Sequence, residues 1–309
     1  MQTVMISGGT GMVGQHLTKH LLAKGYQVII LTRKAPSSPP DNPNITYAIW
    51  NVAKQTIDTN ALQKATHLVH LAGAGVVDKK WTEAYKAEIV KSRTASSALL
   101  IKALRNQAHS IKTVVSASAI GWYGEDASPN AAGFVETDQA AAGFLGDTCK
   151  RWEESIGPVE QLGIRLVKLR IGIVLSNAGG ALAEFKKPLL LGVAGILGTG
   201  EQMVSWIHID DLCRLFAECI ENEQLVGSYN AVAPQPVSNK ELTIELAHQL
   251  KGKFFIPLHV PKFVLKILLG ERSIEVLKST TVDSGKIKKT GFTFFYPSIK
   301  AALHQLAHP

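Results

Sequence analysis

The chain has 309 residues, of which 46% are hydrophobic and 19% charged, so it is long enough and apolar enough to bury a large core. This composition excludes a mainly disordered chain, and only three cysteines occur, which excludes a disulfide framework. The formal net charge of +8 is scattered, and its densest cluster at 286–289 lacks the interleaved aromatic residues of a nucleic-acid surface.

The sequence lacks the usual signals of a secreted, membrane-spanning or metal-binding protein. The N-terminus enters a strand-like run without a secretory leader, and no apolar stretch approaches the ~20 residues that span a bilayer. No Cys/His cluster has metal-ligand spacing. We therefore expect a cytoplasmic protein with a small-molecule substrate, without metal, and with neither nucleic acid nor a membrane as partner. A homodimer is left open.

Short apolar runs alternate with helical stretches through the first two thirds of the chain. The runs that predict strands are 3–7, 27–32, 46–50, 67–71, 112–116 and 165–171. The stretches long enough for connecting helices are 15–24, 82–105 and 145–162. Such alternation predicts the α/β class, with a Rossmann-type, doubly wound parallel sheet.

Beyond residue 175 the regular alternation fades. We assign 1–175 to the Rossmann domain, whose sheet is completed by parts of 200–235, and 176–309 to a smaller helical and mixed substrate-side region. The glycine-containing stretch 192–200 predicts a loop, and Ser238 with Glu241 has capping-box spacing. Helices are expected at 212–221, 242–250, 262–269 and 299–306. This region is expected to form a lid over the carboxyl edge of the sheet.

A glycine-rich stretch between the first predicted strand and helix is the strongest functional signal. It comprises Ser7, Gly8, Gly9, Thr10, Gly11, Met12, Val13 and Gly14. Gly8 would permit the tight turn, Gly11 would let the backbone approach a pyrophosphate, and Gly14 would let the helix pack closely. The helix amides would then hold the phosphates. The stretch predicts a dinucleotide site, with an ordinary strand–helix turn as the alternative.

The end of the second predicted strand indicates which dinucleotide binds. NAD sites usually place a carboxylate there, whereas this chain has Thr32, Arg33 and Lys34. A guanidinium can grip a 2′-phosphate through paired charge-assisted hydrogen bonds, so NADP(H) is favoured over NAD(H). The alternative is that Arg33 begins a polar loop. Small residues at the end of the fourth strand would let the backbone approach an adenine ribose. The predicted cofactor-binding residues there are Leu71, Ala72, Gly73 and Ala74.

These motifs resemble the extended short-chain dehydrogenases/reductases, the superfamily of nucleotide-sugar epimerases and dehydratases. More narrowly, the chain resembles an atypical, epimerase-like branch of largely undefined activity. The segments that carry this resemblance are 80–82, 91–93, 116–124, 144–145, 152–153 and 205–208. The tail at about 250–300 is similar to that branch's own C-terminal domain. The resemblance implies an NADP(H)-binding, epimerase-like or oxidoreductase-like protein that acts on a small carbonyl or sugar-like substrate.

The chain departs from the superfamily at its catalytic Tyr-x-x-x-Lys motif. Counting back from Glu153 places Leu145 at the tyrosine position and Cys149 at the lysine position. The active-site serine is retained as Ser118, and Arg93 stands where an asparagine usually supports a proton relay. The resemblance therefore implies a cofactor site without the usual acid/base pair. A catalytically silent NADP(H) sensor or scaffold is the second hypothesis.

Four residues could carry the remaining chemistry. Tyr123 is the first candidate proton donor, provided that Arg93 lowers its pKa. The alternative is that its ring only lines the wall of the pocket. Cys149 is a second candidate if its thiol pKa is depressed, and otherwise an inert packed residue. Ser118 is expected to donate a hydrogen bond to a substrate oxygen rather than to act as nucleophile.

Three further residues are expected on the substrate side of the cofactor, because the resemblance places their segments there. They are Trp122, Trp206 and His208. His208 could orient a substrate loop together with Asp211. Alternatively, the acidic residues after His208 favour the start of the helix at 212–221 through its dipole.

Overall fold

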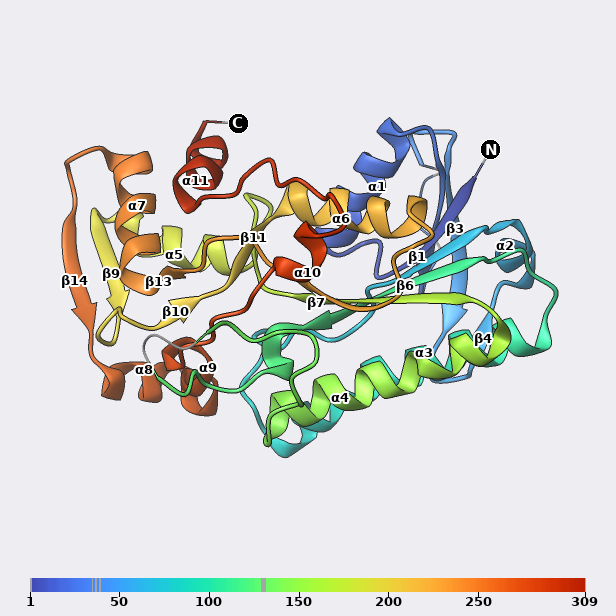
Figure 1. Cartoon of the computed structure of the whole chain (residues 1–309), viewed down its shortest axis with the longest axis horizontal. Coiled ribbons are helices and arrows are strands. Elements are labelled where there is room, and N and C mark those ends of the chain that lie inside the picture. Colours follow the sequence, from blue (N-terminus) through green and yellow to red (C-terminus); the bar gives the residue numbers. More distant parts are fainter. Residues whose placement is uncertain (1, 35, 37, 39, 129–131, 309) are drawn as a thin grey trace.

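A large, nearly all-parallel sheet forms the centre of the molecule in the computed structural model, which describes residues 2–34, 36, 38, 40–128 and 132–308 (Figure 1). Its strands are β1 (Thr3–Ser7), β2 (Gln27–Thr32), β3 (Ile45–Asn51), β4 (Thr56–Ile57), β5 (His67–His70), β6 (Thr113–Ala119), β7 (Arg165–Ile171) and β12 (Gly227–Ala231). They lie in the order β12-β7-β6-β5-β1-β2-β3-β4, and β4 alone runs antiparallel to its neighbour. The chain therefore winds outward from β1 in both directions.

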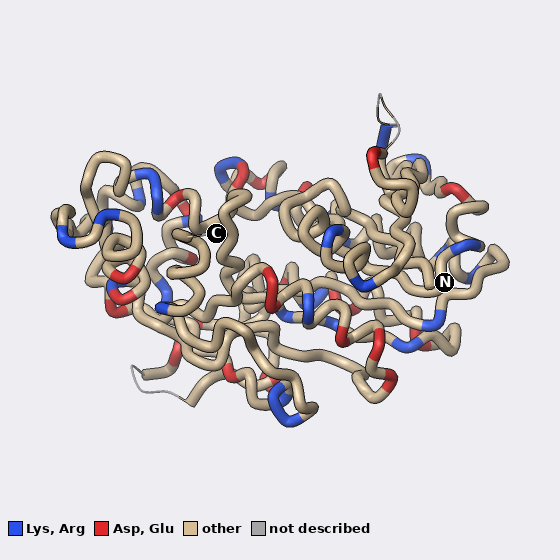
Figure 2. Tube along the Cα trace, turned by 90° about the horizontal axis from the view of Figure 1, so that it is seen from above, with Lys and Arg blue, Asp and Glu red and all other residues tan. Residues whose placement is uncertain are grey.

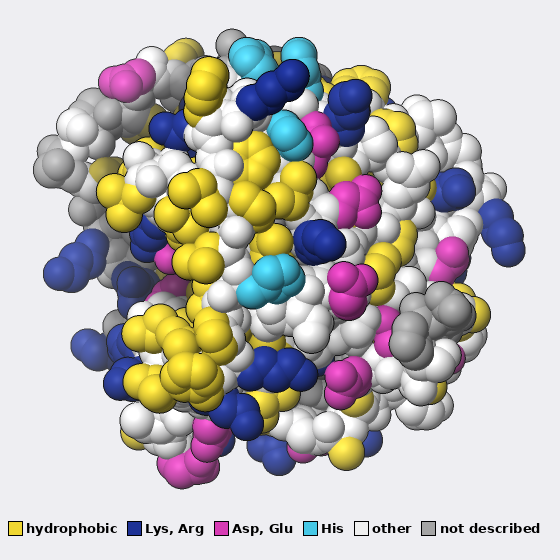
Figure 3. Space-filling view, turned by 90° about the vertical axis from the view of Figure 1, so that its left-hand side faces the viewer, with side chains coloured by type: hydrophobic (Ala, Val, Ile, Leu, Met, Phe, Trp, Pro, Cys, Tyr) yellow, Lys and Arg dark blue, Asp and Glu magenta, His cyan; other side chains and the backbone are white. Residues whose placement is uncertain are grey.

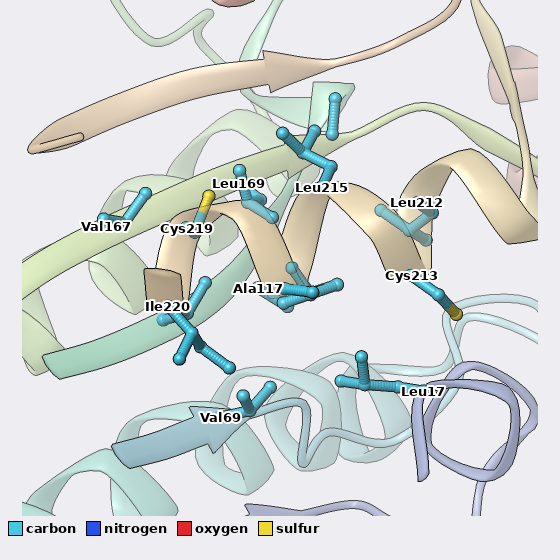
Figure 4. Packing of buried hydrophobic residues seen from close by; sticks show 14 of the residues in the cluster. Leu17, Val69, Ala117, Val167, Leu169, Leu212, Cys213, Leu215, Cys219 and Ile220 are labelled. Carbon is cyan, nitrogen blue, oxygen red and sulfur yellow. The ribbon is translucent and has the colours of Figure 1, made fainter. Parts of the chain in front are cut away.

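Helices cover both faces of this sheet. One face carries α1 (Met12–Ala23) and α6 (Ile209–Glu221), and the other carries α2 (Thr59–Lys64), α3 (Glu83–Asn106), α4 (Phe144–Ile156) and the 3₁₀ helix η2 (Gly157–Leu162). In Figure 4, side chains of α6 such as Leu215 and Cys219 lie among Ala117, Val167 and Leu169 of the sheet. The doubly wound Rossmann class predicted from the sequence is confirmed.

The continuous apolar runs arise because the central strands are buried on both faces. Along β1, Val4 and Ile6 belong to the core under α1 and α6, whereas Met5 belongs to the core under α3. Successive side chains of a strand point to opposite faces, so both parities must be apolar here.

A second, smaller body follows the sheet and lies at the left of Figure 1. It contains β8 (Ile173–Leu175), α5 (Ala181–Leu190), β9 (Val193–Leu197), β10 (Met203–Val204), β11 (Trp206–His208), β13 (Val237–Ser238), α7 (Asn239–Lys251), β14 (Ile256–Val260), α8 (Lys262–Leu269), η3 (Gly270–Arg272), α9 (Ser273–Leu277) and α11 (Ile299–Ala307). Between α9 and α11 the chain returns to the large sheet, where α10 (Gly285–Lys288) packs against β12. A separate core around Leu182, Trp206, Leu242 and Leu303 holds the second body together.

Most predicted elements recur, and the exceptions have local causes. The predicted helix at 262–269 matches α8, and the Ser238 hydroxyl accepts the Glu241 amide at the start of α7, as its spacing predicts. The predicted loop at 192–200 is wrong, because 193–197 form β9, whose partner β14 lies about sixty residues further on. The predicted helix at 145–162 changes to 3₁₀ geometry at Gly157, next to Pro158.

Charged residues of both signs are distributed along the whole trace, with Lys and Arg runs interrupted by Asp and Glu (Figure 2). Within the described part of the chain, no helix combines the length and apolar character needed to cross a membrane.

Candidate functional site

The glycine-rich turn has the geometry that a bound diphosphate requires. Gly8 has a φ of 77°, and a Cβ there would lie 2.9 Å from the carbonyl carbon of Leu71. A Cβ on Gly14 would lie 2.4 Å from the Gly8 oxygen, so the helix approaches the turn at backbone distance. The roles predicted for these two glycines, a tight turn and close helix packing, match this geometry.

The first turn of α1 presents backbone amides that no side chain caps. Gly11 is the N-cap residue and makes no side-chain hydrogen bond, and the first intrahelical bond runs from the Gln15 amide to its carbonyl, 2.9 Å. The amides of Met12, Val13 and Gly14 therefore lack helical acceptors, as at every helix start. A Cβ on Gly11 would meet only the Gly8 oxygen, at 3.4 Å, so the turn fits a phosphate group.

The strand ends beside this turn bring the other predicted cofactor residues close to it. Ser7 pairs in register with Leu31 on β2 and with His70 on β5, which places 32–33 and 71–74 on either side of the glycine turn. The Thr32 hydroxyl donates to the carbonyl of Lys34, and Arg33 is exposed. The carbonyl of Thr10 accepts from Gln15, 2.8 Å.

A buried histidine braces the turn from behind. Ser7 Oγ lies 2.7 Å from His70 Nδ1, and His70 Nε2 lies 3.2 Å from Ser97 Oγ on α3. Burial, with a smaller effect from the charge of Arg93, lowers the pKa of His70 to about 4. The imidazole is therefore neutral at pH 7 and links β1, β5 and α3.

Sequence reasoning missed one segment that reaches the nucleotide turn. Gly179 and Gly180 both have positive φ, 136° and 71°, and a Cβ on Gly180 would lie 3.4 Å from Met12 Sδ. The loop after β8 thus lies against the open start of α1. The signal in the sequence is the Gly-Gly pair directly before α5.

Arg93 lies at the exit of β5 rather than beside Tyr123. Its Nη1 donates to the carbonyls of Ala74 (3.0 Å) and Ile89 (2.9 Å), and its guanidinium stacks over Trp152 at 4.8 Å. The side chain is 8% exposed, and a Cβ on Gly73 would lie 3.1 Å from its Cζ. Arg93 therefore places a fixed positive charge next to the predicted cofactor segment 71–74.

A buried ion pair occupies the carboxyl ends of β6 and β7. Arg170 binds Glu153 through two hydrogen bonds, Nε to Oε1 at 2.8 Å and Nη2 to Oε2 at 3.2 Å. Ser118 also donates to Glu153 Oε1, 2.7 Å, and Lys168 lies 3.9 Å from the same carboxylate. The hydroxyl expected to hold a substrate oxygen thus donates to Glu153 in this structure, and the substrate role of Ser118 stays a prediction.

Tyr123 belongs to the same network. Its hydroxyl donates to Asn230 Oδ1 at 2.6 Å and accepts from Arg170 Nη1 at 3.0 Å, and the residue is only 1% exposed. Burial raises the pKa of Tyr123 to about 12 against the opposing effect of Arg170. The predicted pairing of Tyr123 with Arg93 is wrong, because the neighbouring cation is Arg170. The pKa of Tyr123 also moves away from the range that a proton donor needs at pH 7.

Leu145 and Cys149 stand together beside the end of β6, one turn apart on α4. A Cβ on Gly121 would lie 3.3 Å from Leu145 Cβ and 3.6 Å from Cys149 Sγ. Burial raises the pKa of the Cys149 thiol to about 12, although Arg93 opposes the shift. The surroundings of Cys149 therefore favour the packed thiol over the nucleophile.

A pocket of about 310 Å³ opens next to Leu145. Residues that line it include Trp81, Gly121, Leu145, Glu271, Ile274 and Lys278. The last three come from η3, α9 and the segment after them, so the C-terminal region supplies one wall, as the predicted substrate-side position requires. Trp81 packs edge-on against Phe144 with ring centroids 4.9 Å apart, which makes the inner wall apolar.

The three residues predicted on the substrate side each have a hydrogen-bond partner within the protein. Trp206 is fully buried in the core of the second body, and its Nε1 donates to Gln235. His208 caps α6 by accepting the Asp210 amide at 3.1 Å, and its Nε2 lies 3.0 Å from Gln305 of α11. Trp122 donates to the Asp138 carbonyl, and its ring lies 3.7 Å from the Arg170 guanidinium.

Comparisons with known proteins agree with this architecture. The NAD dependent epimerase/dehydratase family matches residues 4–142, and a domain of unknown function (DUF1731) matches residues 260–306. Epimerase family protein SSP1921 of Staphylococcus saprophyticus is 34% identical over 310 residues, covering 100% of both chains.

Two solved structures have the same fold. The human epimerase family protein SDR39U1, solved with NADPH, is 28% identical with a TM-score of 0.86 and covers 99% of each chain. A nucleoside-diphosphate sugar epimerase from Corynebacterium glutamicum is 30% identical with a TM-score of 0.76, over 99% of this chain and 58% of that one. This chain therefore belongs to the NAD-dependent epimerase/dehydratase family, as an atypical short-chain dehydrogenase/reductase with that branch's own C-terminal domain.

Proposed function

We propose that this protein binds NADP(H) at the glycine-rich turn and reduces or epimerises a small carbonyl or sugar-like substrate in the pocket beside Leu145. The single observation that carries the proposal is the turn itself, where Gly8 and Gly14 leave no room for a Cβ and the first amides of α1 lack acceptors. The pocket lies at the end of β6, on the side of the sheet edge where such cofactors meet their substrates.

The preference for NADP(H) over NAD(H) rests on Arg33. This exposed guanidinium directly follows β2, where a carboxylate would repel a 2′-phosphate. The human relative solved with NADPH supports the same choice. Arg93 would act on the other side of the glycine turn from Arg33, where its contacts with segment 71–74 bring a fixed positive charge close to the cofactor.

Hydride transfer is the chemistry that the nicotinamide supplies when it is bound, and the protein must position the substrate and move a proton. Tyr123, Ser118 and Cys149 are engaged or hold their protons. Among the titratable residues that line the pocket, Glu271 pairs with Lys86 at 2.6 Å and Glu275 with Lys278 at 2.8 Å. Glu125 also lines the pocket, and we assign it the proton-transfer role.

A silent NADP(H) sensor is the second candidate function, and one observation favours it. The four candidate catalytic side chains all have partners or pKa values that do not favour proton transfer. Arg93 and Ser118 are hydrogen-bonded within the fold, and burial raises the pKa of Tyr123 and of Cys149. Glu125→Gln decides between the two functions. An enzyme should lose NADPH turnover on small carbonyl compounds while its NADPH-induced thermal shift persists, whereas a sensor shows no turnover before or after the change. Glu160→Gln, on the far 3₁₀ helix, is the matched control.

The cofactor preference is tested by thermal-shift titration with NADPH and NADH. At ~100 times its dissociation constant, a cofactor should stabilise the native state by about 2.7 kcal/mol. Arg33→Ala removes a charge-assisted contact worth ~1.5–3 kcal/mol, so NADPH affinity should fall roughly ten- to hundredfold while NADH affinity holds. Arg105→Ala, at the exposed end of α3, should change neither affinity. Equal weakening for both cofactors would refute the 2′-phosphate contact.

The state of the cysteines bears on the cellular compartment of the protein. Cys149, Cys213 and Cys219 are all free and buried, which suits a reducing compartment such as the cytoplasm.

A further inference from the structure

A large apolar surface lies on the second body, away from the cofactor site. More than half of the exposed large hydrophobic side chains in the described part of the chain come from 190–191 and 254–268. We call this surface the apolar end face, and it consists of Leu190, Leu191, Phe254, Ile256, Leu258, Phe263, Ile267 and Leu268. Figure 3 views this end of the molecule and shows hydrophobic side chains gathered in adjacent groups, with Lys and Arg and some Asp, Glu and His at their edges.

The ribbon formed by β9 and β14 explains why part of this surface is open. Ala194 and Ile196 of β9 point into the core, so the alternate positions of both strands point outward. The register pairs Ile256 with Val193 and Leu258 with Gly195, which has no side chain. The Ile256 amide donates to Gly192, directly after Leu191, and this contact joins the α5–β9 turn to the same surface. A sheet face in contact with water is usually polar, whereas this one is apolar.

Helix α8 extends the surface. Only Leu265 of its eight residues is buried, while Phe263, Ile267 and Leu268 are exposed. Exposure reaches 88% for Phe254 and 86% for Leu191. A soluble monomer rarely leaves so many contiguous large apolar side chains in water, so the surface marks an interaction site.

The charge around this surface indicates the chemistry of its partner. Residues 246–270 contain Lys251, Lys253, Lys262 and Lys266 and no Asp or Glu. Lys262 and Lys266 lie on α8 between the exposed apolar side chains. Within this segment, which Glu245 and Glu271 border, exposed Phe and Leu stand beside Lys with no acidic residue between them. This is the pattern of segments that lie in the interface of an anionic bilayer.

A second copy of the chain fits this surface less well. The Ile256 amide bonds toward β9, so residue 257 presents its backbone to the outer edge of β14, and Pro257 has no amide hydrogen to donate there. Proline thus weakens pairing with another strand along this edge. Face-to-face association of two copies would also bring the lysines of both toward each other.

We propose that the apolar end face binds the surface of an anionic phospholipid bilayer, with the apolar side chains in the acyl boundary and the lysines at the lipid phosphates. The protein lies on the membrane rather than across it. This proposal revises the sequence-based expectation that a membrane is not a partner, and it does not depend on the proposed cofactor.

Vesicle co-sedimentation tests the proposal with the full chain. The wild type should pellet with vesicles of phosphatidylcholine mixed with phosphatidylglycerol and much less with phosphatidylcholine alone. Phe254→Ser with Phe263→Ser should abolish pelleting. Lys262→Gln with Lys266→Gln should weaken the partition coefficient roughly thirtyfold, because each lysine near the surface contributes a factor of about five.

Val226→Ser and Lys102→Gln are the matched controls, since both residues are exposed outside the apolar end face. Far-UV circular dichroism and a cooperative thermal melt without cofactor report that each variant is folded. Equal pelleting with neutral and anionic vesicles, or pelleting that survives the Phe254/Phe263 changes, would overturn the proposal. A dimer in sedimentation velocity that these same changes dissociate would overturn it in favour of a second copy.

Discussion

The nucleotide turn and the network behind β6 and β7 lie at neighbouring strand ends but treat polar groups in opposite ways. At the turn, amides of α1 face outward without acceptors. In the network, Glu153, Arg170, Tyr123 and Ser118 bond to one another in the interior. Open donors are free to bind a ligand, whereas donors with buried partners hold the fold.

This difference matters for side chains whose residue type suggests catalysis but whose hydrogen bonds stabilise the fold. A serine, a tyrosine and an arginine near a cofactor suggest chemistry on residue type alone, yet Ser118 and Arg170 converge on one carboxylate. The pocket beside Leu145 keeps its aliphatic wall where a proton donor is expected.

The largest effect should come from Arg170→Met, which breaks the network. Glu153 would remain buried without its charge partner, and removing one member of a buried ion pair costs ~3–5 kcal/mol. Urea unfolding measures the loss. Lys24→Met, which breaks the half-exposed pair between Lys24 and Glu221, should cost about 1 kcal/mol or less. Equal losses for both variants would contradict the structural role of the network.

The second effect is a pH dependence at the base of the turn. The folded-state pKa of His70 is about 4, below its ordinary 6.5, so the unfolded chain binds more protons in that window. Stability should therefore fall as the pH falls from 6.5 toward 4, by roughly 3 kcal/mol from this group. His70→Gln should reduce that slope, and the remainder is expected from His67, whose pKa burial also lowers to about 4. His304→Gln, at an exposed position of α11, should leave the slope unchanged. An unchanged slope in His70→Gln would count against the burial of His70.

The third effect concerns the nucleotide turn, where the first amides of α1 lack acceptors. Gly14→Ala should abolish the NADPH-induced stabilisation of about 2.7 kcal/mol seen at ~100 times the dissociation constant. The added Cβ would lie 2.4 Å from the Gly8 oxygen and displace the turn. Gly157→Ala is the matched control, because its φ of −46° is helical and a Cβ there meets nothing within 4 Å. A full NADPH response from Gly14→Ala would remove the basis of the proposed cofactor site.

The sequence was informative wherever one contiguous pattern determines the structure. The strands at 3–7, 27–32 and 165–171 match β1, β2 and β7, because double burial requires an unbroken apolar run. The glycine turn could be recognised from the sequence because the close backbone contact between Gly8 and Gly14, which excludes a Cβ on Gly14, lies within the eight residues 7–14.

The rest depended on partners distant in the sequence. β9 forms only against β14, and the Ser118 and Tyr123 hydroxyls are engaged by Glu153 and Asn230, 35 and 107 residues away. The apolar end face joins 190–191 to 254–268, so a search for one long apolar stretch could not reveal it.

The smallest effect should come from Cys149, whose packed surroundings place it with the network rather than with the open turn. Burial raises its thiol pKa to about 12, so almost none of it is thiolate at pH 8. Folded protein should therefore resist iodoacetamide at this position, as measured by mass spectrometry, and become labelled after unfolding in urea. Cys149→Ala should change NADPH affinity less than about twofold, which corresponds to under ~0.5 kcal/mol. Rapid labelling of the folded protein, prevented by NADPH, would instead place a reactive thiolate at the cofactor and restore Cys149 as a catalytic candidate.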